Sequence, residues 1–221
     1  MLRTFYDLGY NVEWRVINAA EYGCAQKRRR TFIFAWKRNL NYNAISQNTP
    51  FQIMYNVGLF ARNYPIENNA IKNNNVNQDI DLTIYTDTVE MTEKFKTPFY
   101  NTGVMINGIV NTFDSFPIVE PFISMREVRE NRAGLNEYFL TDIQREKFEI
   151  LRGSKKILRT KPNGETYYYS EGSMAFPDSL DLPGRTMLTS EASINRSTHV
   201  IEDMETGNLR FITPVEAERL Q

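Results

Sequence analysis

Thr31-Phe32-Ile33-Phe34-Ala35-Trp36 is a run of β-branched and aromatic residues that predicts a β-strand. Its side chains are apolar on both faces, which is typical of a strand inside a sheet that is covered on both sides. A second strand is predicted from Val12 to Ile17, where Val12, Trp14 and Val16 share one face. The two strands flank a strongly basic loop, and this arrangement is the centre of the fold that we expect.

Caps predict the helices. Three segments place Ser or Thr three residues before Glu or Gln, which is the capping-box pattern of a helix start. They are Ser124-Met125-Arg126-Glu127, Thr141-Asp142-Ile143-Gln144 and Thr213-Pro214-Val215-Glu216. The first two helices are expected to stop at Gly134 and Gly153, and an earlier one, holding Leu2, Phe5 and Tyr6, at Gly9. The chain thus begins within a helix and ends in an uncapped one, so we expect a piece of a longer protein.

The other segments predict short strands and loops. Strand-like runs occur at Phe51 to Leu59, Leu82 to Tyr85 and Val104 to Val110. Asparagine-rich segments at Asn39 to Thr49 and Glu67 to Gln78 predict surface loops. Together with the capped helices, these runs indicate an α+β fold.

Composition excludes several classes of protein. The 221 residues suffice for one large domain or two small ones. No apolar run approaches the roughly 20 residues that span a bilayer, so no membrane is expected as a partner. Cys24 is the only cysteine, which excludes an internal disulfide and a multi-cysteine zinc site, and no metal is expected. A reducing, cytoplasmic location is therefore the default expectation.

The net charge of −1 is not that of a typical nucleic-acid-binding protein, but the cations are unevenly distributed. One block is Lys27 to Arg30. In an extended loop, Gln26, Arg28 and Arg30 share a face, and their guanidinium and amide groups suit phosphates and base edges. The alternative is a solvated basic turn, which basic runs of this length commonly form.

A second basic cluster precedes three tyrosines. Its cations are Arg152, Lys155, Lys156, Arg159 and Lys161, and the tyrosines are Tyr167, Tyr168 and Tyr169. A solvated hairpin around Lys161-Pro162-Asn163-Gly164 is one explanation of this cluster, because Asn-Gly is a strong turn signal.

The flanks of the first basic block carry a family resemblance. Asn18-Ala19-Ala20-Glu21-Tyr22-Gly23-Cys24-Ala25-Gln26-Lys27-Arg28-Arg29-Arg30, followed by the predicted strand, resembles the eighth sequence motif of cytosine-5 DNA methyltransferases. Ala25 departs from the pattern, because the family usually has proline there, and proline fixes its own backbone angle. Arg210 to Gln221, with Thr213-Pro214-Val215-Glu216, is similar to the family's ninth motif at the right order and distance. Leu182 to Thr189, with Thr186-Met187, looks like part of its target-recognition stretch.

The resemblance implies a division of the chain into domains and functions. Residues 1–38 would be the C-terminal part of the catalytic domain, with its last strands, 39–208 a strand-rich target-recognition domain, and 209–221 the start of the ninth-motif helix. Double-stranded DNA would be the partner. The residues implied to contact DNA are Arg28, Arg30, Lys155, Lys156, Arg185, Thr186 and Arg196. His199, as a lone histidine, is more often structural than functional.

Further roles follow from the same resemblance. Arg30 would approach the flipped cytosine and its phosphate, with Gln26 and Arg28 in support. The second basic cluster, with its three tyrosines, would line the DNA groove, and the solvated hairpin explains that cluster equally well. Arg210, Thr213, Glu216 and Arg219 would organise a hinge between the catalytic and recognition lobes. S-adenosylmethionine would be the methyl donor of the whole protein.

The family's Phe-x-Gly-x-Gly, Pro-Cys-Gln and Glu-Asn-Val segments, which bind the cofactor and attack the base, do not occur in this sequence. Cys24 lies within the eighth motif and is not assigned as a nucleophile. We therefore expect the chain alone to be inactive, to lack an N-terminal catalytic half, and to form a homodimer through exposed strand edges. The alternatives are a stand-alone DNA-binding module, a fragment of a tRNA cytosine-5 methyltransferase, and a protein-interaction domain.

Overall fold

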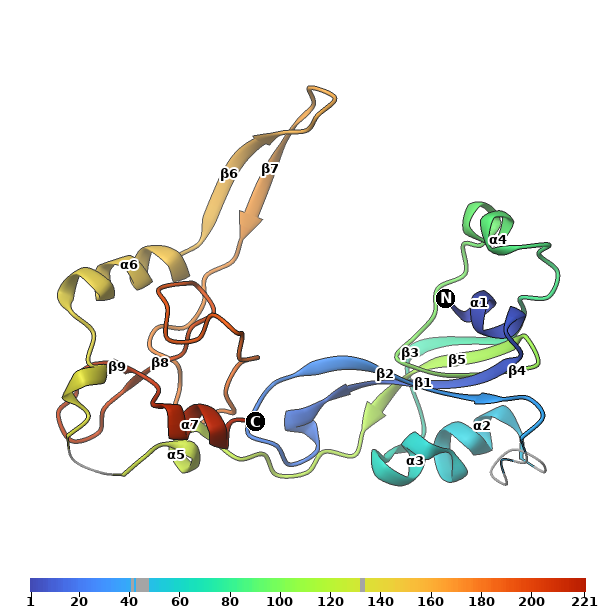
Figure 1. Cartoon of the computed structure of the whole chain (residues 1–221), viewed down its shortest axis with the longest axis horizontal. Coiled ribbons are helices and arrows are strands. Elements are labelled where there is room, and N and C mark those ends of the chain that lie inside the picture. The colour runs from blue at the N-terminus through green and yellow to red at the C-terminus, as the bar shows by residue number, and fades with distance from the viewer. Residues whose placement is uncertain (41, 43–47, 132–133) are drawn as a thin grey trace. The chain divides into compact units, whose positions relative to one another are not determined.

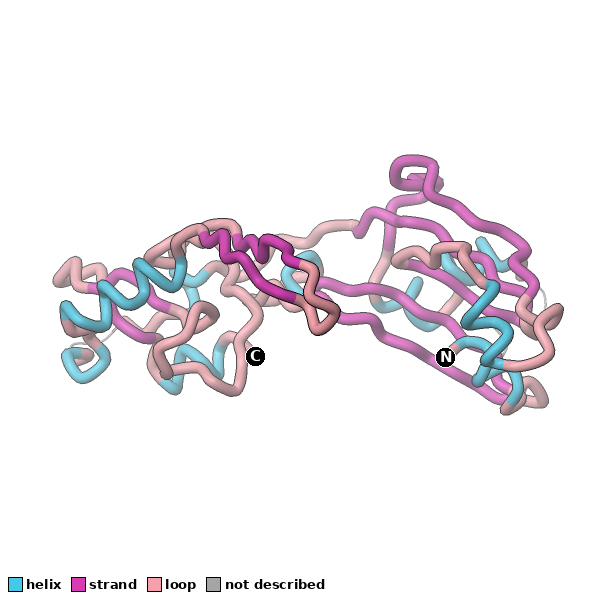
Figure 2. The backbone as a smooth tube through the Cα atoms, turned by 90° about the horizontal axis from the view of Figure 1, so that it is seen from above, coloured by secondary structure: helices cyan, strands magenta, loops and turns pink. Residues whose placement is uncertain are grey.

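A computed structural model describes residues 1–40, 42, 48–131 and 134–221, and the chain divides into two compact units. Unit 1 comprises Met1–Tyr22 and Arg29–Glu120, and unit 2 comprises Gly23–Arg28 and Pro121–Gln221. Helices and mostly antiparallel strands are mixed in the chain, which confirms the α+β class (Figures 1 and 2).

Unit 1 is built on a five-stranded antiparallel sheet with the order β2-β1-β4-β5-β3. Its strands are β1 (Tyr10–Asn18), β2 (Arg29–Lys37), β3 (Ile66–Asp81), β4 (Thr102–Ile106) and β5 (Ile109–Pro117). The predicted strands on either side of the basic loop are therefore confirmed as β1 and β2, which pair with each other. The run from Val104 to Val110, predicted as one strand, contains the turn of the β4–β5 hairpin, because Asn107 and Gly108 turn the chain with positive φ angles.

The helices of unit 1 cover this sheet, and one prediction among them is wrong. They are α1 (Leu2–Asp7), η1 (Ala19–Glu21), α2 (Pro50–Gln52), η2 (Ile53–Val57), α3 (Leu59–Asn63) and α4 (Thr88–Lys94). Phe51 to Leu59 was predicted as a strand and is helical, because Thr49 caps α2 in a capping box. The buried carboxylate of Glu13 also accepts hydrogen bonds from Leu59 N and Phe60 N at the start of α3.

Two further predictions in unit 1 are wrong. Glu67 to Gln78 was predicted as a loop but lies inside β3, since pairing with β5 overrides the low strand propensity of asparagine. That pairing is irregular, with register shifts and positive φ angles at Asn73 and Asn74. Leu82 to Tyr85 was predicted as a strand and forms a loop after β3. Most of the predicted loop from Asn39 to Thr49 lies outside the described residues.

Both faces of the central strands are buried, whereas β2 is an edge strand. Val104 and Met105, neighbours on β4, belong to separate apolar clusters and are both fully buried. By contrast, Phe32 is 47% and Ile33 37% exposed. The expectation that Thr31 to Trp36 lies inside a sheet is wrong for the described residues, because none of them pairs with the outer side of β2.

Unit 2 combines short helices with two hairpins. Its elements are α5 (Met125–Val128), η3 (Asn136–Tyr138), α6 (Asp142–Arg152), β6 (Lys155–Thr160), β7 (Thr166–Glu171), β8 (Val200–Glu202), β9 (Leu209–Phe211) and α7 (Pro214–Arg219). The capping boxes predicted at Ser124, Thr141 and Thr213 are all confirmed. The predicted stop at Gly134 is wrong, since α5 already ends at Val128, whereas α6 ends at Gly153 as expected.

The division between the two compact units does not fall at residue 38, and the predicted boundary there between a catalytic and a recognition domain stays a prediction. Strands β3, β4 and β5 extend the sheet that β1 and β2 begin, and all five strands belong to unit 1. Among the described residues, none of the helices combines the length and the apolar character that crossing a membrane requires.

Candidate nucleic-acid interface

The loop Gly23–Arg28 belongs to unit 2, where its backbone is bound by the segment from Gly184 to Thr186. Lys27 N donates to Gly184 O at 2.7 Å, and Gly184 N donates to Ala25 O at 2.8 Å. The hydroxyl of Thr186 donates to Lys27 O at 2.6 Å. Ala25, which stands where the family usually has proline, is buried in the apolar cluster of unit 2. Hydrogen bonds and packing therefore hold this loop without the fixed backbone angle of proline.

Gln26 fixes the same loop through its side chain, which is 4% exposed. Its Nε2 donates to Leu220 O, at the end of α7, at 3.1 Å. Its Oε1 accepts from Met187 N at 3.3 Å. One buried amide thus joins the basic loop to two segments that are distant in the sequence.

The expectation that Gln26, Arg28 and Arg30 share a face is wrong. Arg28 N donates to Gln26 O at 2.9 Å, so the backbone turns tightly at Lys27 and is not extended there. Gln26 is consequently buried while Arg28 is exposed, and Arg30 lies in β2 of unit 1. Within the described chain the guanidinium of Arg28 has no hydrogen-bond or ion-pair partner, whereas Arg30 Nη1 donates to Arg29 O at 2.7 Å.

Replacing Gln26 by alanine is expected to destabilise unit 2 by about 1–3 kcal/mol, because Leu220 O and Met187 N lose a buried partner. The measurement is urea unfolding followed by far-UV circular dichroism. Lys27→Ala is the matched control, because that side chain is exposed and its backbone bonds survive the change. Equal midpoints for the two variants would contradict the role given to Gln26.

Two of the arginines predicted to contact DNA are bound by protein acceptors. Arg185 donates to both carboxylate oxygens of Asp178, at 2.8 and 3.1 Å. The same carboxylate accepts from the buried Arg152 at 2.9 Å. Arg196 donates to Glu171 at 2.6 Å and also to Gly172 O. Contact of Arg185 and Arg196 with DNA stays a prediction, but both guanidinium groups already stabilise unit 2.

The residues of the predicted hinge form a buried cluster inside unit 2. Arg210 donates to both oxygens of Glu216 at 2.7 Å, and neither side chain is more than 1% exposed. Glu216 also accepts from the backbone N–H groups of Thr213 and Glu130, at 2.8 and 2.7 Å. Arg219 donates to the carbonyl of Val128 at 3.0 Å. These contacts join β9, α7 and the segment after α5, all within unit 2. The role of these residues in a hinge between lobes stays a prediction.

His199 is fully buried, and Glu191 binds it twice. The backbone N–H donates to Glu191 Oε1 at 2.7 Å, and Nδ1 lies 3.0 Å from Glu191 Oε2. These contacts fit the structural role that is usual for a lone histidine.

The second basic cluster forms an exposed two-stranded ribbon, β6–β7, which Figure 1 shows projecting from unit 2. The hairpin predicted around Lys161-Pro162-Asn163-Gly164 is confirmed, with Gly164 at a φ of +86°. Lys156 lies over the ring of Tyr168, with Nζ 4.6 Å from the centroid, and Arg159 lies 3.9 Å from that of Tyr169. Arg152, the first residue of the cluster, is instead buried at the end of α6.

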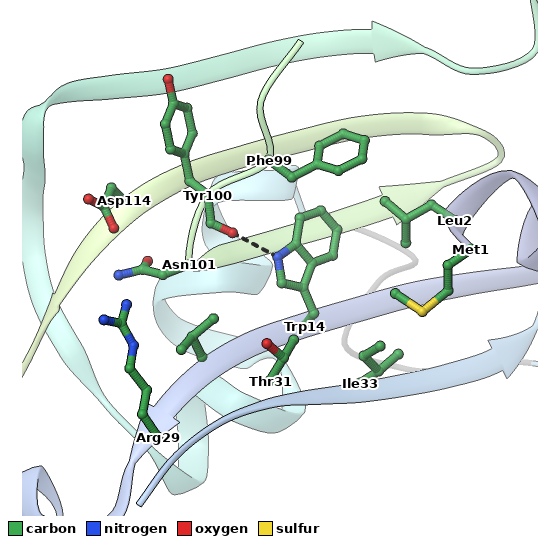
Figure 3. A pocket seen from close by; sticks show the side chains of 11 residues that line it. Met1, Leu2, Trp14, Arg29, Thr31, Ile33, Phe99, Tyr100, Asn101 and Asp114 are labelled. Carbon is green, nitrogen blue, oxygen red and sulfur yellow. Dashed lines mark hydrogen bonds between the residues drawn. The ribbon is translucent and has the colours of Figure 1, made fainter. Parts of the chain in front are cut away.

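Unit 1 contains an apolar cavity of about 460 Å³ over its sheet (Figure 3). The indole of Trp14 lies at its centre and donates to Tyr100 O at 3.0 Å. Gly103, opposite Trp14 on β4, is required here, because a Cβ atom would lie 2.0 Å from the indole. Arg29 and Asp114 are the charged residues of the lining, and none of the described glycines contributes to it.

Comparisons with known proteins identify the class to which this fold and basic loop belong. A model of the C-5 cytosine-specific DNA methylase family matches residues 1–221, so the chain belongs to this family. It is 49% identical over 221 residues to the Type II methyltransferase M.Sau3AI of Staphylococcus aureus, covering 100% of this chain and 52% of that protein. It is 24% identical over 198 residues to the Type II methylase M.HgiEI of Herpetosiphon aurantiacus, covering 77% of this chain and 43% of that protein. The Type II methyltransferase M.MthTI of Methanothermobacter thermautotrophicus is 46% identical over 41 residues, which cover 19% of this chain and 12% of that protein.

The chain therefore spans about half the length of the curated relatives that it matches over most of its residues. No solved structure matches the chain.

Proposed function

We propose that the protein carrying this chain methylates C5 of cytosine at a short site in duplex DNA, as part of a restriction–modification system. The observation that carries the proposal is the family match over residues 1–221, together with the relationship to Type II methyltransferases. In this proposal unit 2 recognises the DNA target. Arg28, exposed on a loop that unit 2 holds rigidly, is the cation best placed to bind a DNA phosphate.

The proposal also assigns β1 and β2 to the end of the catalytic sheet. Phe32 and Ile33 on the free edge of β2 are exposed, and a strand edge of this kind favours pairing with further strands. The nucleophile and the cofactor site would then lie in sequence outside this chain, which would make the chain alone inactive. We also propose a cytoplasmic location for the whole protein, because a reducing compartment fits a chain whose only cysteine is Cys24.

Among the described residues, the lining of the apolar cavity of unit 1 does not fit S-adenosylmethionine, the cofactor that the family implies. A glycine-rich turn lets the backbone approach a bound cofactor closely. The sequence has no Phe-x-Gly-x-Gly segment, and the apolar cavity of unit 1 has no glycine in its lining. We therefore propose S-adenosylmethionine as the methyl donor of the whole protein only.

The test is methyl transfer by the protein expressed from the gene with its flanking coding sequence. We expect label from S-adenosylmethionine to appear at C5 of cytosine in duplex DNA, at one sequence found by bisulfite sequencing. Transfer to tRNA in place of DNA, or no transfer to duplex DNA, would overturn the proposal. The 221-residue chain, assayed beside it, is expected to bind duplex DNA in a salt-sensitive manner without methylating it.

Self-association of the 221-residue chain through the free edge of β2 is a further expected result. Light scattering should give a dimer mass, and Ile33→Lys should return the chain to a monomer, because a charge on an edge strand opposes pairing. Ile84→Lys is the matched control, since Ile84 is exposed on a loop of the same unit. A monomeric wild-type chain, or a dimer that Ile33→Lys leaves intact, would contradict pairing through this edge.

A further inference from the structure

The ribbon β6–β7 has two faces of different chemistry. Residues directly opposite each other on paired strands lie on one face, and successive residues alternate between faces. The threonine face, as we name it, consists of Lys156, Leu158, Thr160, Thr166, Tyr168 and Ser170. The opposite face consists of Lys155, Ile157, Arg159, Tyr167, Tyr169 and Glu171.

Most polar groups of the opposite face bind one another. Lys155 pairs with Glu171, Tyr169 donates to Glu171 Oε1 at 2.6 Å, and Arg159 lies over the ring of Tyr169. The carboxylate of Glu171 also binds Arg196, in the body of unit 2. This face therefore contains a carboxylate, which repels phosphates, and its hydrogen-bonding groups are largely used within the protein.

The threonine face has the reverse properties. Its charged group is the ammonium of Lys156, it has no carboxylate, and it carries hydroxyl groups along its length. Leu158 and Tyr168, directly opposite each other, are 57% and 61% exposed, compared with 44% and 41% for Ile157 and Tyr167 of the opposite face. An isolated two-stranded ribbon is marginally stable in water, so large apolar side chains exposed at its centre indicate a surface that a partner covers.

We propose that the threonine face of β6–β7 enters the major groove of duplex DNA and reads base edges there. The major groove admits a two-stranded ribbon, and its floor offers acceptors on guanine and a methyl group on thymine. An ammonium, hydroxyls and an aliphatic side chain match those groups, and the uncompensated positive charge matches the phosphates on either side. The inference rests on the proposed function, because family membership is what selects DNA as the polyanion.

Paired double variants of the 221-residue chain test the proposal, because each removes one aliphatic and one tyrosine side chain from a single face. Leu158→Ala with Tyr168→Ala alters the threonine face, and Ile157→Ala with Tyr167→Ala alters the opposite face. Each chain selects duplexes from a pool with randomised central positions, and its affinity is measured by anisotropy. We expect the threonine-face variant to lose sequence preference and to bind about tenfold more weakly, and the opposite-face variant to keep both.

A second measurement identifies the groove and uses the wild-type chain. Dimethyl sulfate methylates guanine N7 in the major groove and adenine N3 in the minor groove, and we expect only guanine N7 methylation to block the wild-type chain. Thr166→Val, which preserves the shape of the side chain and removes its hydroxyl, should change the selected sequence without lowering thermal stability.

Three outcomes would overturn the inference. They are an unchanged preference in the threonine-face variant, an equal loss in the opposite-face variant, and interference by adenine N3 methylation alone. Methyl transfer to an unchanged site by the whole protein with the threonine-face changes would refute the ribbon and leave the proposed function intact. Absence of DNA binding by the wild-type chain would instead refute both the ribbon and DNA recognition by unit 2.

Discussion

Replacing Glu216 by alanine is expected to unfold unit 2 at urea concentrations where unit 1 is still folded. The carboxylate of Glu216 is fully buried and accepts two hydrogen bonds from Arg210 and two from backbone N–H groups. Removing one partner of a buried ion pair leaves the other charge uncompensated, which costs about 3–5 kcal/mol. Such a loss is a large share of the roughly 5–15 kcal/mol that stabilises a typical domain.

The chain offers a direct way to separate the two units in this experiment. Both tryptophans, Trp14 and Trp36, belong to unit 1. Tryptophan fluorescence therefore reports unit 1, while far-UV circular dichroism reports both units. We expect the Glu216→Ala variant to lose part of its dichroism early and to keep the wild-type fluorescence midpoint.

Glu218→Ala is the matched control for this prediction, since Glu218 is exposed on the same helix. It should shift neither signal by more than about 0.5 kcal/mol, as is usual for exposed positions. If Glu216→Ala and Glu218→Ala unfold alike, the buried pair does not stabilise unit 2 in the way that its geometry indicates.

The elements that local sequence predicts well are those whose stabilising contacts are also local. The capping boxes at Ser124, Thr141 and Thr213 use a side chain and a backbone group three residues apart, and all three form. The turn at Asn163-Gly164 is confirmed for the same reason, because glycine adopts the required positive φ at little cost.

The errors arise where distant residues decide the structure. β3 contains many asparagines and becomes a strand only because β5 pairs with it. The helix start after Gly58 depends on the carboxylate of Glu13, which lies 46 residues earlier in the chain. The burial of Gln26 likewise depends on Leu220 O, 194 residues away, and no local pattern contains that information.

Contacts between residues far apart in the sequence also explain the errors in the candidate interface. Arg185 and Arg196 lie in a polar segment and resemble DNA ligands in sequence, but Asp178 and Glu171 bind them in the folded unit. The exposed state of Arg28 was predicted from its basic loop, whereas the burial of Gln26 two residues earlier was not. Distinguishing a cation that stabilises the fold from one that is available to DNA requires the positions of carboxylates elsewhere in the chain.

Acid is expected to destabilise unit 2 through Asp178. Burial by itself raises the pKa of this carboxyl, but the hydrogen bond from Arg185 and the charges of Arg185 and Arg152 outweigh it and hold the pKa below its ordinary value. A carboxyl with a lowered pKa in the folded state stabilises the fold fully above its unfolded pKa, which is about 3.9. That stabilisation is lost as the pH falls below about 4 and through the folded pKa.

Glu13 in unit 1 has the opposite effect. Burial raises the pKa of Glu13 despite the hydrogen bonds from Phe60 N and Leu59 N. Folding of unit 1 therefore takes up a proton at this site, and the contribution of Glu13 to stability improves as the pH falls from the folded pKa toward the unfolded one. Acid should thus shift the dichroism transition to lower urea more strongly than the fluorescence transition.

Asp178→Asn is the variant that tests this pH dependence. We expect its free energy of unfolding to fall by about 3–5 kcal/mol at neutral pH, because Arg152 keeps its buried charge without a carboxylate. The variant should also lose less stability than the wild type between pH 7 and pH 3, since the titrating group is gone. Asp181→Asn is the matched control, as its carboxylate pairs with Arg126 at the surface, where an ion pair contributes little. Urea unfolding of the three chains across this pH range would contradict the assignment if Asp178→Asn retained the full acid sensitivity of the wild type.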